Sequence, residues 1–149
     1  MTETKRAHDA RAPHVPLTNY YPDEPSRAGF VKEMFDTTAV DYDRMEKVLS
    51  FGTGKWYRGQ ALQRAGLKPG MRVLDVGVGT GLVASEAARI VGQPELVCGV
   101  DPSSSMMETA KVPAGVQLVN GTAESIPFPD AHFDFLSMGY ALRHIGDLR

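Results

Sequence analysis

The sequence has little that would mark a secreted, membrane-spanning or nucleic-acid-binding protein. Its 149 residues include one cysteine, Cys98, which excludes an internal disulfide framework and fits a reducing compartment. No run of about 18 apolar residues occurs, so no transmembrane helix is predicted. A formal net charge of −2 leaves no basic footprint for nucleic acid. We therefore expect a cytoplasmic protein with no nucleic-acid partner and no stable membrane insertion.

Metal-binding and targeting patterns are missing as well. The four histidines are scattered, and neither Cys-x-x-Cys nor His-x-x-x-His occurs, so we predict no metal site. The first 28 residues contain four prolines and few aliphatic side chains, and they lack the apolar core of a signal peptide. Their acidic residues also argue against a mitochondrial transit peptide. We expect a flexible N-terminal arm over residues 1–28.

The most informative segment is residues 72–81, Arg-Val-Leu-Asp-Val-Gly-Val-Gly-Thr-Gly. Its first half suits a buried strand, and residues 82–91 have helical character that stops at Gly92. Glycine lets the chain turn sharply and lets backbone approach a ligand closely. The glycines recur at every second position: Gly77, Gly79 and Gly81. Strand, loop and helix together predict a nucleotide-type cradle at a helix N-terminus, the alternative being an ordinary glycine turn.

The glycine spacing points away from a dinucleotide. The dinucleotide fingerprint is Gly-x-Gly-x-x-Gly, whereas this loop is one residue tighter and has Asp75 two residues before its first glycine. The form Asp-x-Gly-x-Gly-x-Gly resembles motif I of class I S-adenosylmethionine-dependent methyltransferases. The resemblance implies a Rossmann-like α/β fold, a three-layer sandwich around a parallel sheet, with S-adenosylmethionine as cofactor. The loop would hold the methionine end of that ligand, with backbone N–H groups available to its carboxylate.

A second strand is predicted over residues 96–100, followed by Asp101, 20 residues after Gly81. In Rossmann-like folds an acid at the end of the second strand accepts hydrogen bonds from ribose hydroxyls. The alternative is that Asp101 serves only as a helix cap or turn residue. The following segment, residues 102–107, can cap a helix without it.

Three further segments make the resemblance specific. Residues 121–130, Gly-Thr-Ala-Glu-Ser-Ile-Pro-Phe-Pro-Asp, precede an apolar strand at 133–138. Residues 35–52 begin Phe-Asp and end Leu-Ser-Phe-Gly, and residues 140–144 read Tyr-Ala-Leu-Arg-His. All three are similar to the ubiquinone/menaquinone biosynthesis C-methyltransferases. The resemblance runs from about Phe30 to Asp147.

The resemblance implies a role for each matching position. Asp75 would support the loop, Asp101 would bind the ribose, and Tyr42 would lie near the methionine carboxylate or merely pack on the sheet. Ser103 and Met106 would flank the adenine, and residues 122–124 would contact its ring and amino group. The cofactor-binding residues implied are Tyr42, Asp75, Gly77, Gly79, Thr80, Gly81, Asp101, Ser103, Met106, Thr122, Ala123 and Glu124.

The catalytic residues implied are Arg143 and His144, which would orient or deprotonate a quinol hydroxyl. The family has Arg-Asn there, and imidazole suits proton transfer, although a solvated histidine at a helix start is the plainer alternative. Trp56 and Phe51 would line a substrate mouth or pack in the core. Glu46 and Lys47 replace the family's Asn-Asp near the expected quinol, which leaves the acceptor open.

We count four strands, at about 72–76, 96–100, 116–119 and 133–138, whereas the family's sheet normally has seven. The chain is therefore expected to be the N-terminal part of a methyltransferase, with a helical cap over 29–65 and a truncated cofactor-binding half over 66–149. The fourth strand would then be an exposed edge. We expect marginal stability or completion by association, including homo-oligomers.

Methyl transfer to carbon of a quinol-type ring is the function predicted, with a small-molecule acceptor. Three alternatives stay open: methyl transfer to oxygen or nitrogen of another small molecule, a cofactor-binding chain without activity, and an NAD-dependent oxidoreductase half-domain. The glycine spacing and the Pro-Phe-Pro-Asp loop count against the last.

Overall fold

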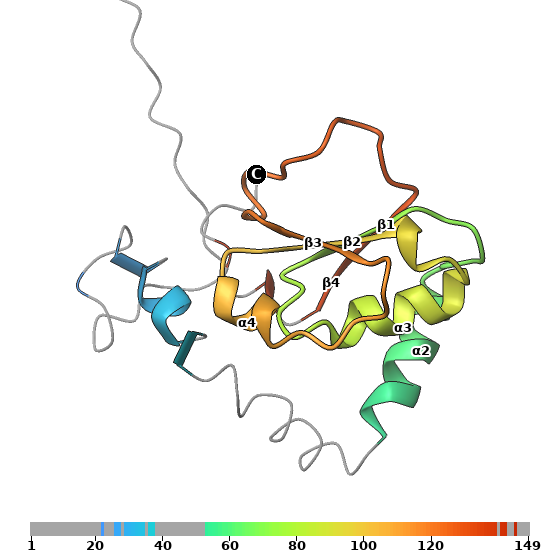
Figure 1. The fold of residues 1–149 in the computed structure, drawn as a ribbon, viewed down its shortest axis with the longest axis horizontal. Helices are drawn as coiled ribbons and strands as arrows, with labels where there is room; N and C mark the ends of the chain where they lie inside the picture. Colours follow the sequence, from blue (N-terminus) through green and yellow to red (C-terminus); the bar gives the residue numbers. More distant parts are fainter. Residues whose placement is uncertain are drawn as a thin grey trace, which may run out of the picture.

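A parallel sheet forms the centre of the computed structural model, which describes residues 22, 26–27, 29–34, 36–37, 53–139, 141–142 and 145 (Figure 1). Its four strands run in the order β3-β2-β1-β4, and every neighbouring pair is parallel. The strands are β1 (Val73–Val76), β2 (Val97–Asp101), β3 (Gln117–Asn120) and β4 (Phe135–Met138). Each strand begins one or two residues later than the sequence predicts. The expected parallel α/β architecture is confirmed.

α2 (Gly54–Arg64) precedes β1, whereas α3 (Leu82–Val91) connects β1 to β2 and α4 (Ser104–Glu108) connects β2 to β3. A 3-10 turn at Pro94–Leu96 precedes β2. The expected end of α3 is confirmed, because Gly92 is its C-cap with a φ of 78°. Ser103 caps α4 by accepting the N–H of Met106, so this helix is capped without Asp101, as predicted.

The two faces of the sheet are covered differently. In Figure 1, α3 and α4 lie on one side of the sheet and the loop between β3 and β4 passes over the other. On the helix side, Val73 and Val97 pack with the small residues of α3 and with Leu62 of α2. On the loop side, the inward residues of β1 and β2 pack against Phe128 and Phe133. Among the described residues the core is therefore layered, with one face of the sheet under helices and the other under the loop between β3 and β4.

β4 is positioned by the residue that precedes β1. The carbonyl of Arg72 accepts the N–H groups of Asp134 and Phe135, at 2.9 and 3.1 Å. The Asp134 carboxylate accepts the backbone N–H of Arg72 at 2.9 Å and its guanidinium at 3.2 Å. Backbone and side-chain bonds thus reinforce the register in which Val73 lies opposite Phe135. Among the described residues, β4 pairs only with β1, so it forms one edge of the sheet.

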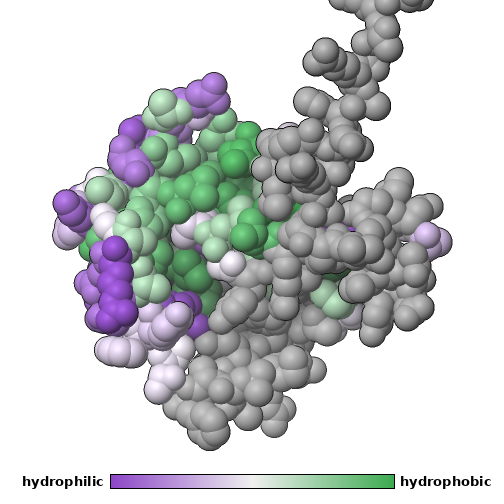
Figure 2. Space-filling view, turned by 180° about the vertical axis from the view of Figure 1, so that it is seen from behind, coloured by the Kyte–Doolittle hydropathy of each residue, from purple (hydrophilic) through white to green (hydrophobic). Residues whose placement is uncertain are grey.

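Apolar surface is exposed beside this edge. Figure 2 shows a continuous apolar area on the face seen from behind, with polar residues along part of its margin. Leu136 of β4 remains 55% exposed, and Ile126 of the covering loop remains 37% exposed. Parallel sheets are ordinarily covered on both faces, so the exposed side chain of Leu136 marks a part of the sheet that the described residues leave uncovered.

The strand order places a switch point between β1 and β4. The chain moves from β1 outward to β2 and β3, then returns to the other side of β1. Ligands of open α/β sheets bind at the carboxyl ends of the strands where the order reverses. The glycine loop follows β1 at this point, and Asp101 ends the neighbouring strand β2.

Candidate functional site

The glycine loop is held tightly against the end of β2. The N–H groups of Gly77 and Val78 both donate to the carbonyl of Val100, at 2.8 and 3.1 Å. Gly81 donates to Val78, and its φ of 86° is in the left-handed region that favours glycine. With the N–H of Gly79 bound to Asp101, four N–H groups of this loop already have protein acceptors. Which backbone N–H groups of the loop meet a ligand carboxylate stays a prediction.

Two glycines are required by close contacts. A Cβ on Gly81 would overlap the side chain of Val112, which belongs to the segment between α4 and β3. A Cβ on Gly99 in β2 would lie only 2.6 Å from a methyl group of Val78. The loop can therefore lie against β2 only because residue 99 has no side chain. Both contacts hold the loop in place. The glycine spacing in the sequence pointed to Gly81, but it did not point to Gly99.

Asp101 is the centre of the site. One carboxylate oxygen, Oδ2, accepts the N–H of Gly79 at 2.8 Å, and the other, Oδ1, accepts the N–H of Ser103 at 2.8 Å. The residue is only 8% exposed. Burial raises the pKa of its carboxyl, the two backbone N–H groups oppose that rise, and the charge of Asp36 adds to it. A carboxylate has about four acceptor positions, so each oxygen retains capacity for one more donor, such as a ribose hydroxyl.

Asp75 lies beneath the loop, inside β1. Its Oδ1 accepts the hydroxyl of Ser137 from β4 at 2.8 Å, whereas its buried Oδ2 makes no hydrogen bond within the described part of the chain. Burial raises the pKa of Asp75 to about 7, although the Ser137 hydroxyl and, more weakly, the Ala84 N–H favour the charged form. Asp75 therefore links β1 to β4 directly below the glycine loop. Its hydrogen bond is made to β4, and its role in supporting the glycine loop stays a prediction.

The predicted adenosine residues form two groups. Gly79, Asp101, Ser103 and Met106 come together, since a Cβ on Gly79 would lie 3.3 Å from the end of the Met106 side chain. The second group, Thr122, Ala123 and Glu124, follows β3. It is joined to the first through Gly121, whose N–H donates to the carbonyl of Asp101 at 3.1 Å. Thr80 lies between Gly79 and Gly81, and its carbonyl accepts the N–H of Lys111 at 3.1 Å.

Three predicted site residues, Tyr42, Arg143 and His144, lie outside the described residues, and so does Phe51. Trp56 is described and is 67% exposed on α2, which contradicts core packing as its role. Its neighbour Tyr57 is 65% exposed. All the predicted cofactor residues except Tyr42 therefore lie in the described part of the chain, and the catalytic pair stays a prediction.

Several residues at the site were missed by the sequence analysis. Asn120 donates through its amide to the carbonyls of Asp101 and Pro102, both at 3.2 Å, and so fixes the turn after β2. Ser137 was read only as part of an apolar strand, although a lone hydroxyl in such a strand is a signal for a buried partner. Asp36 contacts the start of α4 from far away in the sequence, and no local pattern indicates this.

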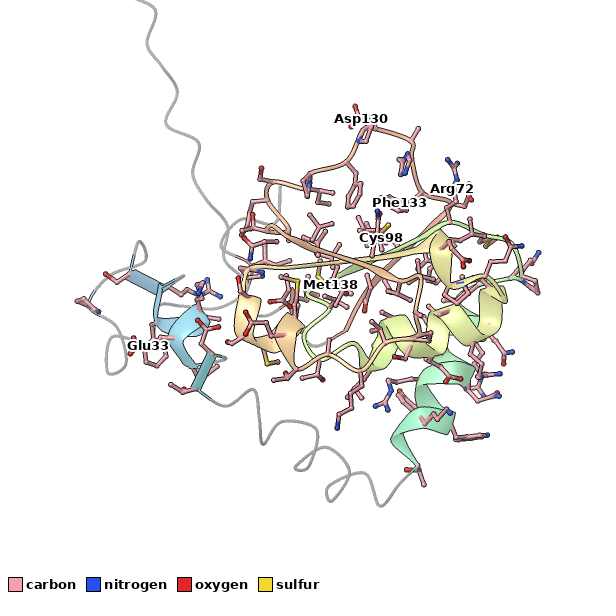
Figure 3. All side chains as sticks on the ribbon, in the orientation of Figure 1. Glu33, Arg72, Cys98, Asp130, Phe133 and Met138 are labelled. Atoms are coloured by element: carbon pink, nitrogen blue, oxygen red, sulfur yellow. The ribbon has the colours of Figure 1, made fainter. Side chains whose placement is uncertain are left out.

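A shallow hollow of about 570 Å³ lies beside the site, under the loop between β3 and β4. Its walls are Leu74, Leu136 and residues of the loop, including Ala123 and Glu124. Figure 3 shows Asp130 at the outer tip of this loop and Phe133 beneath it, above Cys98 in the sheet. His132 is exposed, and its ring stacks on that of Phe128 with 6.0 Å between the ring centroids.

Two other expectations concern absences. Among the described residues, no helix is long and apolar enough to cross a membrane. No group of three or more histidine, cysteine, aspartate or glutamate side chains in that part of the chain could hold a metal ion. Cys98 is buried in β2, where burial raises the pKa of its thiol.

A Rossmann-like sheet with an acid-anchored glycine loop defines a nucleotide-type binding protein, and comparison with known proteins narrows the class. A family model described as the ubiE/COQ5 methyltransferase family matches residues 23–149. The chain is 34% identical over 128 residues to the ubiquinone/menaquinone biosynthesis C-methyltransferase UbiE of Shewanella halifaxensis, covering 81% of this chain and 51% of that protein. The corresponding Shewanella pealeana protein is 34% identical over 126 residues, with 80% and 50% covered. The chain belongs to the ubiE/COQ5 methyltransferase family.

Solved structures agree with this assignment. An S-adenosylmethionine-dependent methyltransferase from Thermotoga maritima is 33% identical, with a TM-score of 0.54 over 71% of this chain and 45% of that one. A methyltransferase from Methanococcus maripaludis, 20% identical, has a TM-score of 0.64 over 76% of this chain and 53% of that one, which supports the fold alone. The predicted class I methyltransferase fold is confirmed, with four parallel strands among the described residues. The chain spans about half the length of the curated relatives it matches.

Proposed function

We propose that this chain forms the S-adenosylmethionine-binding part of a methyltransferase whose acceptor is a carbon atom of a quinol-type ring. The observation that carries the cofactor assignment is the buried Asp101 carboxylate at the end of β2, bound to Gly79 of the glycine loop. It combines an acid suited to ribose hydroxyls with a loop too tight to accept side chains. Family membership supports the same cofactor.

The residues present fit that cofactor. Asp101 would supply acceptors for the ribose hydroxyls, Ser103 and Met106 would flank the adenine, and residues 122–124 would contact its ring and amino group. Gly77, Gly79, Thr80 and Gly81 would line the methionine part, and Asp75 would support this loop. Tyr42 is proposed, by resemblance, to lie near the methionine carboxylate. When bound, S-adenosylmethionine supplies an electrophilic methyl group attached to a positively charged sulfur.

For methyl transfer, the protein mainly contributes positioning, because the reaction is an in-line displacement. Loss of a proton from a ring hydroxyl raises the nucleophilicity of the quinol carbon. We propose that Arg143 and His144 orient that hydroxyl and that the imidazole of His144 accepts its proton. A quinol acceptor is supported by the Phe35–Gly52 resemblance and by the names of the Shewanella relatives. A small-molecule acceptor, a helical cap over 29–65 and a cytoplasmic location are part of the same proposal.

The cofactor assignment is tested by thermal melts of the chain with S-adenosylmethionine, S-adenosylhomocysteine or NAD. A ligand that binds only the folded state raises the midpoint. We expect a rise with both adenosyl-sulfur ligands and none with NAD. A rise with NAD alone would support the oxidoreductase alternative, and a clear transition that no ligand moves would contradict cofactor binding.

The methyl acceptor is identified with the complete protein. It is incubated with methyl-labelled S-adenosylmethionine and a quinol that lacks one ring methyl group. We expect the label on a ring carbon, identified by fragmentation in mass spectrometry. Label on oxygen would instead support the O-methyltransferase alternative. His144→Ala should slow turnover strongly while leaving S-adenosylhomocysteine affinity unchanged, and unchanged turnover would remove His144 from the mechanism.

A further inference from the structure

A helical segment near the N-terminus contacts the cofactor end of the sheet through one carboxylate. Residues 29–34 and 36–37 are helical, and Figure 1 shows this segment beside α4. The Oδ1 atom of Asp36 accepts the hydroxyls of both Ser103 and Ser105, at 2.5 and 2.6 Å. Its Oδ2 atom accepts the ammonium group of Lys32 at 2.7 Å. Both oxygens are thus engaged, one by its own helix and one by the start of α4.

These contacts continue as a chain of hydrogen bonds to the glycine loop. Ser103 donates its hydroxyl to Asp36 and its backbone N–H to Oδ1 of Asp101, the latter at 2.8 Å. Asp101 in turn accepts the N–H of Gly79 through Oδ2 at 2.8 Å. The sequence of contacts is therefore Asp36, Ser103, Asp101, Gly79. It joins the N-terminal segment to the loop after β1 through the residue proposed to bind the ribose.

Ser103 is well suited to transmit this restraint. It is 1% exposed, and its Oγ also accepts the N–H of Met106 as the N-cap of α4. Because its hydrogen is directed to a carboxylate, its lone pairs are left for that capping bond. Hydroxyl–carboxylate bonds are short and strong, and successive hydrogen bonds polarise one another. Loss of the Asp36 carboxylate would leave the buried hydroxyl of Ser103 without its acceptor. Ser103 lies in the turn after β2.

We infer that Asp36 is a positioning residue for the cofactor: it fixes the turn from Asp101 to Ser105 and docks the N-terminal segment over the ribose side of the site. This inference rests on the proposed cofactor. The bonds at Lys32, Ser103 and Ser105 keep the pKa of Asp36 below its ordinary value, so the carboxylate is charged at neutral pH. Binding of the cofactor and docking of residues 29–37 are then coupled, and each favours the other.

The test is calorimetric titration of S-adenosylhomocysteine into four versions of the chain. The variants are Asp36→Ala, Asp36→Asn and the control Glu33→Gln, compared with the unaltered chain. Glu33 is an exposed carboxylate on the same helical segment (Figure 3). We expect about a tenfold higher Kd for Asp36→Ala, a smaller rise for Asp36→Asn, whose amide oxygen still accepts one hydroxyl, and no change for Glu33→Gln.

Ser105→Ala provides a second route, because Ser105 donates to Asp36 and is not among the proposed cofactor contacts. If both act through one contact, the double variant Asp36→Ala with Ser105→Ala loses little more affinity than Asp36→Ala alone. Additive losses would contradict this coupling.

Hydrogen exchange separates positioning from a general loss of stability. In the unaltered chain, S-adenosylhomocysteine should slow exchange at the amides of residues 29–37 as well as at Gly79 and Ser103. In Asp36→Ala, protection of residues 29–34 and 36–37 by the ligand should be lost while the strands stay protected. Equal affinity and equal ligand protection in the Asp36 variants would overturn the inference and leave the proposed function intact. No binding by the unaltered, folded chain would overturn both.

Discussion

The carboxylate of Asp101 at the end of β2 accepts the backbone N–H of Gly79 at 2.8 Å, which ties the ribose-binding candidate directly to the glycine loop. The two residues are 22 positions apart in the sequence, and their contact brings the ends of two neighbouring strands together. A substitution at either residue therefore disturbs both the loop and the turn after β2. This contact is the centre of the proposed cofactor site.

Asp101→Asn should weaken S-adenosylhomocysteine binding by a factor of ten or more, equivalent to about 1.4 kcal/mol. The amide keeps one acceptor but loses the charge, and its NH₂ group faces a backbone donor. Titration calorimetry measures the change. Asp130→Asn, at the exposed tip of the loop between β3 and β4, is the matched control and should bind normally. Equal affinities for the two variants would remove Asp101 from the site.

Gly81→Ala should destabilise the fold by about 2–4 kcal/mol, because it combines a left-handed backbone with overlap on Val112. Gly66→Ala is the matched control: its φ is 100°, but a Cβ there meets nothing within 4 Å. It should cost only about 1 kcal/mol. Chemical denaturation gives both values. Val112→Ala should restore part of the loss in Gly81→Ala, and failure to do so would show that the overlap is not the cause.

Asp75 predicts a pH dependence of stability. Its pKa in the folded chain is raised by burial to about 7, whereas its ordinary value is 3.8. The folded state therefore holds the proton more tightly, so the contribution of Asp75 is fully present below about pH 4 and is lost as pH rises to about 7. The loss is at most about 4 kcal/mol.

Asp75→Asn should remove this slope, so the difference between the unfolding free energies of the two proteins should change between about pH 4 and 7 and stay constant above it. Urea titrations at several pH values measure it. Asp36 and Asp134 have lowered pKa values, so their titration in the fold falls below this window. Parallel stability curves for the two proteins would contradict a raised pKa at Asp75.

The contact between Arg72 and Asp134 should matter more through the backbone than through charge. Asp134→Ala leaves the N–H of Arg72 without its carboxylate acceptor, whereas Arg72→Ala keeps that bond and loses only an exposed ion pair. We expect a larger fall in Tm for Asp134→Ala than for Arg72→Ala. Added salt should reduce the effect of Arg72→Ala and leave most of the other. The reverse order would mean that the ion pair, not the backbone bond, positions β4.

Local features of this fold were predictable from sequence, and long-range ones were not. The strand, the turn and the end of α3 at Gly92 follow from periodicity and glycine within about 20 residues. The Ser103 cap is likewise local. By contrast, the contacts of Asp36 with Ser103, of Ser137 with Asp75 and of Val112 with Gly81 join separate parts of the chain. Each depends on tertiary packing, which a residue pattern does not encode.

The same difference applies to the hydrogen bonds of the loop. Glycine spacing indicates close backbone approach, but it does not say which N–H groups the protein itself uses. In the structure, Val100, Asp101 and Val78 accept the N–H groups at Gly77, Val78, Gly79 and Gly81. The loop therefore contributes shape and proximity, while the acid after β2 contributes the acceptors.

The most direct test is an NMR titration of the ¹⁵N-labelled chain with S-adenosylhomocysteine, following each backbone amide. We expect saturable chemical-shift changes concentrated at the amides of residues 77–81 and 101–106, with smaller changes at residues 121–124. NAD should leave these amides unchanged. A dispersed spectrum of a folded chain that S-adenosylhomocysteine does not alter, or shifts confined to another surface, would contradict the proposed cofactor site.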